Sequence, residues 1–138
     1  MLSKELLRKK YSKLRKQKYY SIKKSFFQPL VRLLKKKIKK NNLVVGIYYP
    51  ILSEVNVLKI LEFKIFNKYT ISLPKIKKDQ IKFYEWNKTN VMEVNKYGIL
   101  EPILTSNKVN PDVILIPLLS YDDKKNRLGY GKGYYDKF

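Results

Sequence analysis

Apolar side chains recur at every third or fourth position in the first part of the chain, which is the spacing of one helix face. This spacing predicts a helix over 3–18, which Ser3 can cap at its start. It predicts a second helix over 21–40, with Pro29 in the first turn or at a kink. The apolar positions are Leu6, Leu7, Tyr11, Leu14, Phe27, Val31, Leu34 and Ile38.

Further along the chain, the apolar residues form short unbroken runs. Residues 43–49 and 112–116 are nearly all apolar, and each run is followed by a proline. Such runs are typical of strands that are buried on both faces, as in a parallel sheet. Shorter runs over 69–73 and 81–86 also predict strands, and 56–66 predicts a helix.

The order of these elements predicts one α/β domain over 1–138. We expect a three-layer α/β/α sandwich with a mostly parallel sheet. Residues 1–20 are basic throughout and lack the apolar segment of a signal peptide. No apolar run reaches the length of a membrane span. We therefore expect a cytoplasmic monomer that does not enter a membrane.

Three alternating glycines near the end of the chain carry the clearest chemical signal. They enclose Tyr130 and Lys132 and lie at Gly129, Gly131 and Gly133. Glycine lets the backbone approach a ligand closely, and successive N–H groups can bind phosphate oxygens. Arg127 and Lys132 add positive charge, and Asp136 can bind Mg²⁺ between phosphates. The pattern predicts a phosphate loop that opens a helix, although a structural glycine-rich turn would have the same spacing.

The composition limits the chemistry that this loop can support. The chain contains no cysteine and no histidine, which excludes thiol catalysis and every Ser-His or Cys-His mechanism. Catalysis must therefore use carboxylates, Lys, Arg, Tyr, backbone amides or a bound metal.

The net charge of +20 has two interpretations. A basic chain of this kind can bind nucleic acid. However, the chain has no alanine and is rich in Lys, Asn, Ile, Tyr and Phe, residues with A/T-rich codons. Its 31 cationic residues are mostly lysine, whereas phosphate and base recognition favour arginine. We therefore favour codon bias as the main source of the charge, and nucleic acid is not the expected partner.

Several other residues have both a functional and a structural interpretation. Glu54 follows a predicted strand, where ligands gather in α/β sheets, but it also suits a helix entry. Lys4 and Arg8 share one helix face, which can bind a ligand or can simply be a solvated basic face. Trp86 can stack on a planar heterocycle or belong to the core. Residues 97–102 form a compact turn with no required chemistry.

Together, these motifs resemble the 5-formyltetrahydrofolate cyclo-ligase family, whose members are also called methenyltetrahydrofolate synthetases. The resemblance covers nearly the whole chain, and the glycine motif is its most specific part. In order along the chain, it rests on Lys4-x-x-x-Arg8, Tyr49-Pro50, Ser53-Glu54-Val55, 97–102, 111–117 and 126–136.

The resemblance implies a magnesium- and ATP-dependent closure of 5-formyltetrahydrofolate to 5,10-methenyltetrahydrofolate, with release of ADP and phosphate. In the route proposed for the family, the formyl oxygen attacks the γ-phosphate. N10 of the folate then attacks the activated carbon, and phosphate leaves. Phosphoryl transfer needs mainly positioning and charge neutralisation, which the available residue types can provide.

The resemblance also implies site residues. ATP is expected at Lys4, Glu5, Leu6, Leu7, Arg8, Arg127, Leu128, Gly129, Tyr130, Gly131, Lys132, Gly133, Tyr134 and Tyr135. Folate is expected at Tyr49, Glu54, Tyr130, Gly131, Lys132, Gly133 and Tyr134, and Mg²⁺ at Asp136. We expect Lys132 and Arg127 to be catalytic. A separate hypothesis places Trp86 on the pterin by stacking.

The family continues for several dozen residues after the tyrosine-aspartate motif, whereas this sequence ends at Phe138. We therefore expect a chain truncated at its C-terminus relative to the family, with C-terminal strands missing. Two alternatives to an active ligase stay open. One is a basic RNA-binding module, and the other is a degenerate, inactive relative.

Overall fold

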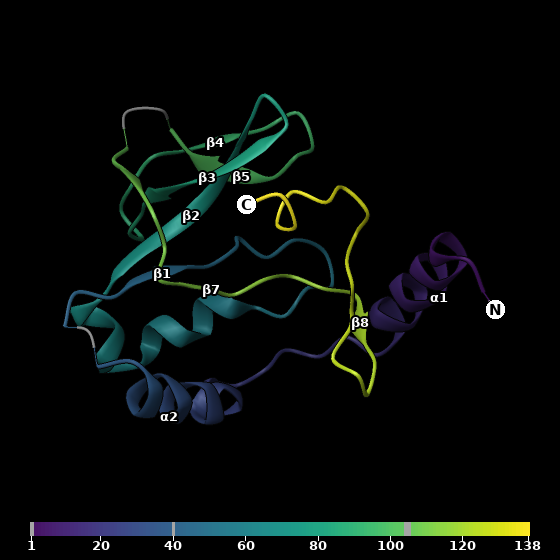
Figure 1. Ribbon diagram of the computed structural model, residues 1–138, viewed down its shortest axis with the longest axis horizontal. Coiled ribbons are helices and arrows are strands. Elements are labelled where there is room, and N and C mark those ends of the chain that lie inside the picture. Colours follow the sequence, from purple (N-terminus) through teal and green to yellow (C-terminus); the bar gives the residue numbers. More distant parts are fainter. Residues whose placement is uncertain (1, 40, 104–105) are drawn as a thin grey trace.

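The computed structural model describes residues 2–39, 41–103 and 106–138 (Figure 1). Helix α1 (Lys4–Gln17) begins as predicted, because the Ser3 side chain accepts a hydrogen bond from the Leu6 N–H at 3.3 Å. The second predicted helix is shorter than expected. It consists of a 3₁₀ turn, η1 (Lys24–Phe27), followed by α2 (Gln28–Lys37). Pro29 lies in the first turn of α2. Backbone N–H groups in this turn have no acceptor within the helix, so a residue without an N–H is tolerated there.

The central sheet has five strands in the order β6-β3-β2-β1-β7. Strand β1 pairs in parallel with both β2 and β7, while β3 pairs antiparallel with β2 and β6. The bounds are β1 (Val44–Gly46), β2 (Thr70–Lys77), β3 (Gln80–Glu85), β6 (Lys108–Val109) and β7 (Val113–Ile114). The predicted α/β fold is thus confirmed, but the sheet is mixed rather than mostly parallel.

A tight turn explains the antiparallel half of the sheet. Strand β2 continues through Pro74, where the sequence analysis ends it, and reaches Lys77. Lys78 and Asp79 then adopt φ angles of 48° and 59°. Two consecutive positive φ angles are typical of a two-residue hairpin turn, so β3 returns beside β2 with no crossover helix.

The predicted helix over 56–66 is replaced by two 3₁₀ helices, η2 (Val57–Glu62) and η3 (Lys64–Lys68). Val57, Ile60 and Phe66 are buried at spacings of three and six. A three-residue repeat fits the 3₁₀ helix, which has three residues per turn, better than the α-helix. The predicted helix after the glycines is also absent, because 134–136 form only a turn.

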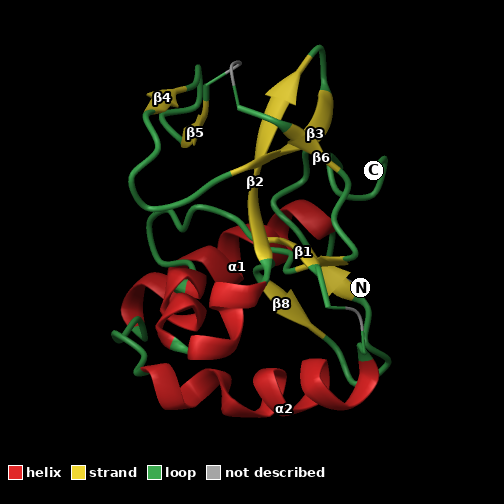
Figure 2. Cartoon of the chain, turned by 90° about the vertical axis from the view of Figure 1, so that its left-hand side faces the viewer, coloured by secondary structure: helices red, strands yellow, loops and turns green. Residues whose placement is uncertain are grey.

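The hydrophobic core lies on the helical side of the sheet (Figure 2). Val45 and Ile47 of the β1 segment point into it and are fully buried, together with Leu73 of β2. Gly46 points to the opposite side, where a Cβ would lie 2.8 Å from the Phe83 ring. On that side, the Phe138 ring lies 5.2 Å from the Phe83 ring. In the described part of the chain, the C-terminal loop thus covers the Phe83 side of the sheet at this point.

Two hairpins flank the sheet. The first consists of β4 (Met92–Val94) and β5 (Leu100–Pro102) and contacts β2. The second consists of β8 (Ser120–Tyr121) and β9 (Arg127–Leu128) and leads directly into the glycine-rich segment. Across the described ranges, none of the helices has the length and apolar character to span a membrane.

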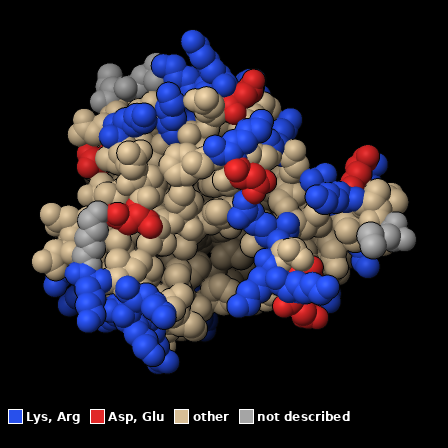
Figure 3. Space-filling view, in the orientation of Figure 1, with Lys and Arg blue, Asp and Glu red and all other residues tan. Residues whose placement is uncertain are grey.

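The basic residues do not form one continuous stripe on the face in Figure 3. Lysines and arginines lie there in several groups, with uncharged surface between them. The exposed lysines come from different elements, including the last turn of α2 and the end of the β2–β3 hairpin.

Candidate functional site

A pocket of about 310 Å³ lies beyond the carboxyl end of β1. Its walls come from segments that are far apart in the sequence. They include the stretch after β1 with Tyr48 and Tyr49, the β2–β3 hairpin, the β4–β5 hairpin, and residues 130–136. Ligands of open α/β sheets bind at this end of the strands, so the fold alone makes this pocket the candidate site.

Glu54 is a buried carboxyl group on the pocket wall, with 6 % of its surface exposed. Its Oε2 accepts a hydrogen bond from the Ile51 N–H at 2.9 Å. Burial raises the pKa of Glu54 above its usual value, although hydrogen bonds from Ile51 and Tyr130 oppose the rise. Burial in turn raises the pKa of Tyr130 to about 12. The pair therefore provides a carboxyl group and a neutral hydroxyl group to a ligand.

Two more tyrosines enclose this carboxyl group. The Tyr48 hydroxyl donates a hydrogen bond to the Val55 carbonyl at 2.9 Å, which ties β1 to the loop that carries Glu54. Burial raises the pKa of Tyr48 and that of Tyr135. The pocket around Glu54 is thus lined by uncharged phenols.

The glycine-rich segment has a backbone conformation that favours glycine at two positions. Gly131 and Gly133 have φ angles of 99° and 67°, a region that favours glycine. The Arg8 Nε donates to the Gly129 carbonyl at 3.0 Å. A Cβ at position 131 would lie 3.1 Å from the Arg8 Cζ. Helix α1 therefore places a cationic side chain directly against the loop, 121 residues away in the sequence.

The tip of the β4–β5 hairpin contacts the opposite side of the loop. The hydroxyl groups of Tyr97 and Tyr134 lie 3.2 Å apart. Lys132 Nζ lies 5.4 Å from the centroid of the Tyr97 ring. The hydrogen bond between the tyrosines lowers the pKa of Tyr97 and raises that of Tyr134 to about 12.

An ion pair joins the two ends of the glycine-rich segment. The Arg127 guanidinium contacts the Asp136 carboxylate, and both side chains are partly exposed. Asp136 lies on the pocket wall, whereas Arg127 lies outside it. Across the described ranges, no group of three or more His, Cys, Asp or Glu side chains could hold a metal ion.

The pocket brings half of the predicted site residues together. Tyr49, Glu54, Asp136 and residues 130–135 line it. Of the predicted α1 residues, Arg8 contacts the loop, while Lys4, Glu5 and Leu6 are exposed and Leu7 is half-buried. Glu5 instead pairs with Lys9 at 3.1 Å. Leu128 is half-buried in β9, just before the loop.

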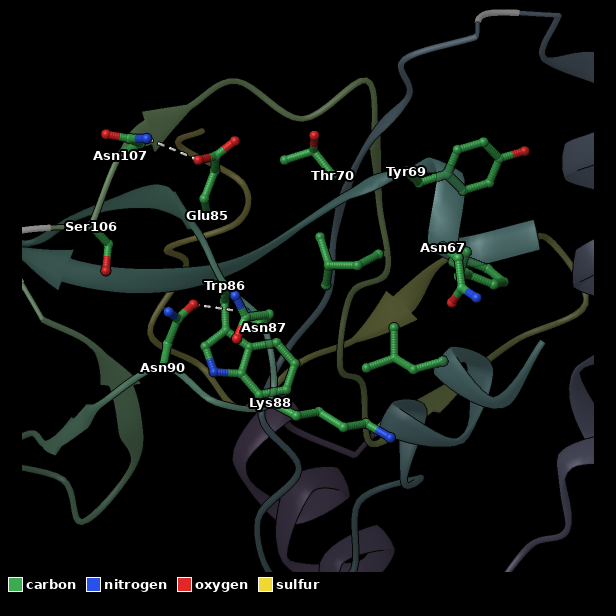
Figure 4. Close-up of a pocket in the computed structure, with 13 residues that line it drawn as sticks. Asn67, Tyr69, Thr70, Glu85, Trp86, Asn87, Lys88, Asn90, Ser106 and Asn107 are labelled. Atoms are coloured by element: carbon green, nitrogen blue, oxygen red, sulfur yellow. Dashed lines mark hydrogen bonds between the residues drawn. The ribbon is translucent and has the colours of Figure 1, made fainter. Parts of the chain in front are cut away.

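Trp86 lies elsewhere, in a separate cavity of about 670 Å³ (Figure 4). Its indole belongs to the hydrophobic core and is 8 % exposed. Asn87 and Asn90 surround the cavity beside it and hydrogen-bond to each other at 2.8 Å. The position of Trp86 does not support stacking on a pterin in the glycine-loop pocket.

Sequence reasoning missed Tyr48, Tyr97 and the β4–β5 hairpin as parts of the site. Tyr48 belongs to an apolar run and has the pattern of a core residue. The sequence predicts a structural turn over 97–102, because it does not indicate what this turn packs against. The tyrosine at the head of that turn was the available signal, since an exposed aromatic residue at a loop tip often marks a binding surface.

A comparison with known families decides the identity. The model of the 5-formyltetrahydrofolate cyclo-ligase family matches residues 1–138. The chain belongs to this family. Relatives named 5-formyltetrahydrofolate cyclo-ligase include the Haemophilus influenzae protein, 28 % identical over 120 residues, and the Mycoplasma genitalium protein, 34 % identical over 99 residues. These matches cover 82 % and 67 % of this chain, but 63 % and 48 % of the two cyclo-ligases.

Solved structures of two family members agree with the fold. The 5,10-methenyltetrahydrofolate synthetase of Aquifex aeolicus is 30 % identical and superposes with a TM-score of 0.74, covering 99 % of this chain and 71 % of that one. The synthetase of Mycoplasma pneumoniae is 28 % identical, with a TM-score of 0.71, and the match covers 99 % and 77 %.

Proposed function

We propose that the chain catalyses the ATP- and Mg²⁺-dependent cyclisation of 5-formyltetrahydrofolate to 5,10-methenyltetrahydrofolate, with release of ADP and phosphate. One observation carries this proposal. A single pocket joins Tyr49 and Glu54, which the family resemblance assigns to folate, with residues 130–136, which it assigns to ATP and metal. Both substrates can therefore meet in one place, as a transfer between them requires.

The ATP side of the proposal rests on the glycine-rich loop. Gly133 has open space beside its backbone, Gly131 faces the Arg8 guanidinium, and Lys132 contributes a flexible positive charge, so the loop offers a cationic surface to phosphate oxygens. Arg8 lies against the same loop through its hydrogen bond to Gly129. Phosphoryl transfer depends on charge neutralisation and alignment, and these groups provide both without a histidine or a cysteine.

The donor set also fits a magnesium ion that arrives with the nucleotide. Mg²⁺ is commonly bound by one or two carboxylates together with substrate phosphates. Asp136 lies on the pocket wall and offers one such carboxylate, which Arg127 orients by ion pairing. When bound, the ion would neutralise the charge of the transferred phosphoryl group.

The folate side rests on the phenols and the carboxyl group around β1. Tyr49 and Tyr130 provide flat apolar surface with a polar edge, which suits a pterin ring. Glu54 offers a hydrogen-bonding carboxyl group at the bottom of the same wall. The β4–β5 hairpin faces these residues and encloses the remaining side.

The direct test is a turnover assay with 5-formyltetrahydrofolate and Mg-ATP, followed by the absorbance of the methenyl product. We expect turnover in the wild type and a loss of at least about a hundredfold in Lys132→Ala and Asp136→Ala, because Lys132 would neutralise transition-state charge directly and Asp136 would hold the Mg²⁺ that does so. Matched controls are Lys124→Ala and Asp123→Ala, which change exposed residues in the β8–β9 turn. Both controls should retain wild-type rates.

Wild-type rates in either pocket variant would contradict the assigned roles. A wild type that binds both substrates but forms no product would instead support an inactive relative. Binding measured by calorimetry distinguishes that outcome from a failure to bind at all.

A further inference from the structure

A buried ion pair lies at the edge of the pocket, where Glu101 belongs to the lining and Lys75 does not, and it takes no part in the proposed chemistry. Lys75 of β2 and Glu101 of β5 are 3.2 Å apart, and their side chains are 6 % and 7 % exposed. Lys75 Nζ also donates to the Pro102 carbonyl at 2.8 Å and contacts the Glu93 carboxylate of β4. One lysine thus binds both strands of the hairpin to the central sheet.

The charge of Lys75 is held by these partners. Burial lowers the pKa of the lysine, but hydrogen bonds to Glu93 and Glu101 outweigh this effect and raise it above its usual value. A buried ion pair seldom stabilises a fold more than apolar residues of the same size. A role in fixing geometry therefore explains the pair better than a role in stability.

The other oxygen of Glu101 continues the network toward the hairpin tip. Oε2 accepts from the Asn95 Nδ2 at 3.1 Å and from the Ile76 N–H at 3.4 Å. Asn95 Oδ1 then accepts from the N–H groups of Tyr97 at 2.9 Å and Ile99 at 3.1 Å. The shape of the tip is thus set by a side chain that Glu101 orients.

This tip is the part of the hairpin that contacts the glycine-rich loop. Tyr97 meets Tyr134 at 3.2 Å between hydroxyls and lies under the Lys132 ammonium. Glu101 and Asn95 themselves border the pocket. A continuous series of polar contacts therefore leads from Lys75 inside the molecule to the ligand-facing side of Tyr97.

We propose that Lys75 and Glu101 are positioning residues for the folate subsite, a role that rests on the proposed function. By fixing the β4–β5 hairpin on β2, they hold the Tyr97 turn against the glycine-rich loop and so shape the wall that faces the folate. They touch no reacting atom, and their effect reaches the ligand through Asn95 and Tyr97.

The first experiment needs no activity. Amide hydrogen exchange is compared between the wild type, Lys75→Met and Glu101→Gln. We expect exchange over 95–100 to become about tenfold faster or more, as local opening requires, and exchange in the β2–β3 pairing to stay unchanged. Lys59→Met serves as the control, because it breaks an exposed ion pair with Glu62, whose contact length is 3.0 Å. It should leave both regions unchanged.

The second experiment separates the two substrates. In Lys75→Met, the KM for 5-formyltetrahydrofolate should rise about tenfold, a typical effect of a displaced binding wall. The KM for ATP and kcat should change much less. Lys75→Arg keeps the charge and should restore most of the folate KM. Tyr97→Phe should add little to the effect of Lys75→Met if both act through the same turn.

Unchanged exchange over 95–100 in both variants would overturn the proposal, whatever the activity of the chain. Global acceleration of exchange would overturn it as well, since it would indicate a purely stabilising pair. If the wild type neither binds nor converts folate, the proposed function fails, and the exchange result still decides whether the pair positions the turn.

Discussion

At the scale of single residues, two glycines in one loop meet different constraints. Gly131 has a φ of 99° and the Arg8 guanidinium where its Cβ would lie. Gly129 has nothing within 4 Å of that point, and no positive φ is found there. The alternating pattern in the sequence therefore hides a difference in function between its members.

We expect Gly131→Ala to lower the free energy of unfolding by about 1 to 3 kcal/mol, because a residue with a Cβ is strained at this φ. ATP affinity should fall as well, since the loop must shift away from Arg8. Gly129→Ala is the matched variant for stability and should change the free energy of unfolding little, because nothing lies within 4 Å of its Cβ position. Chemical unfolding and calorimetric titration with Mg-ATP measure the two effects. Equal behaviour of the two variants would show that backbone conformation does not limit the loop.

Glu54 gives a second prediction, about the dependence of stability on pH. Burial raises its pKa in the folded state above the ordinary 4.5. The folded protein then binds this proton more tightly than the unfolded chain, so this group's contribution to stability falls as the pH rises from 4.5 through the raised pKa. Relative to the wild type, Glu54→Gln should gain stability over that range and then level off.

Urea unfolding at a series of pH values measures this difference. Glu5→Gln provides the control, because Glu5 is an exposed carboxylate with 75 % of its side chain accessible. Its curve should run parallel to that of the wild type. A Glu54→Gln curve that also runs parallel would show that Glu54 is not held in a protonation-sensitive environment.

At the scale of elements, local signals were predicted well and partner-dependent ones were not. The start of α1 follows from Ser3 alone, and the sequence predicts it correctly. The direction of β3 depends on a turn at Lys78 and Asp79. Aspartate adopts positive φ more often than most residues, but lysine does not, and no glycine marks this turn, so the sequence did not predict a hairpin here. The 3₁₀ helices η2 and η3 likewise depend on side chains that are buried at three-residue intervals. The apolar pattern over 56–66 is compatible with an α-helix as well, so the sequence does not distinguish the two kinds of helix.

None of the described residues of helix α1 is buried, so apolar packing contributes little to holding this helix on the rest of the protein. The hydrogen bond from Arg8 to Gly129 is therefore expected to hold the helix on the glycine-rich loop. In Arg8→Ala, we expect exchange over 4–17 to accelerate and ATP affinity to fall about tenfold, since a hydrogen bond from a charged donor contributes about 1.5 to 3 kcal/mol.

Arg32→Ala is the matched control for this change, because Arg32 is an exposed arginine on α2. It should leave exchange over 4–17 and the ATP affinity as they are in the wild type. Slow exchange over 4–17 in Arg8→Ala would mean that the half-buried side chains of α1 hold the helix without Arg8.

At the scale of the whole molecule, the site exists only because several segments that are distant in the sequence meet. The family motifs predicted which residues of 49–54 and 130–136 belong together, and these line one pocket. They did not predict that the β4–β5 hairpin closes the remaining side, because its position depends on Lys75 and Glu101, which meet across the fold. Trp86 lies in the core and outside this pocket, and residue type alone does not separate a core indole from a ligand platform.

The net charge of +20 is also a property of the whole molecule. The way in which binding depends on salt distinguishes a cyclo-ligase from an RNA-binding module. The charged groups on the face in Figure 3 are scattered rather than aligned, so we expect only non-specific attraction to polyanions.

Binding of a single-stranded RNA probe should be detectable at low salt and should fall by orders of magnitude between about 50 and 200 mM salt, because counterions are released on binding. Binding of 5-formyltetrahydrofolate with Mg-ATP should change far less over the same range, since the pocket encloses its ligands. RNA affinity that persists at high salt, together with absent folate binding, would favour the nucleic-acid alternative over the cyclo-ligase.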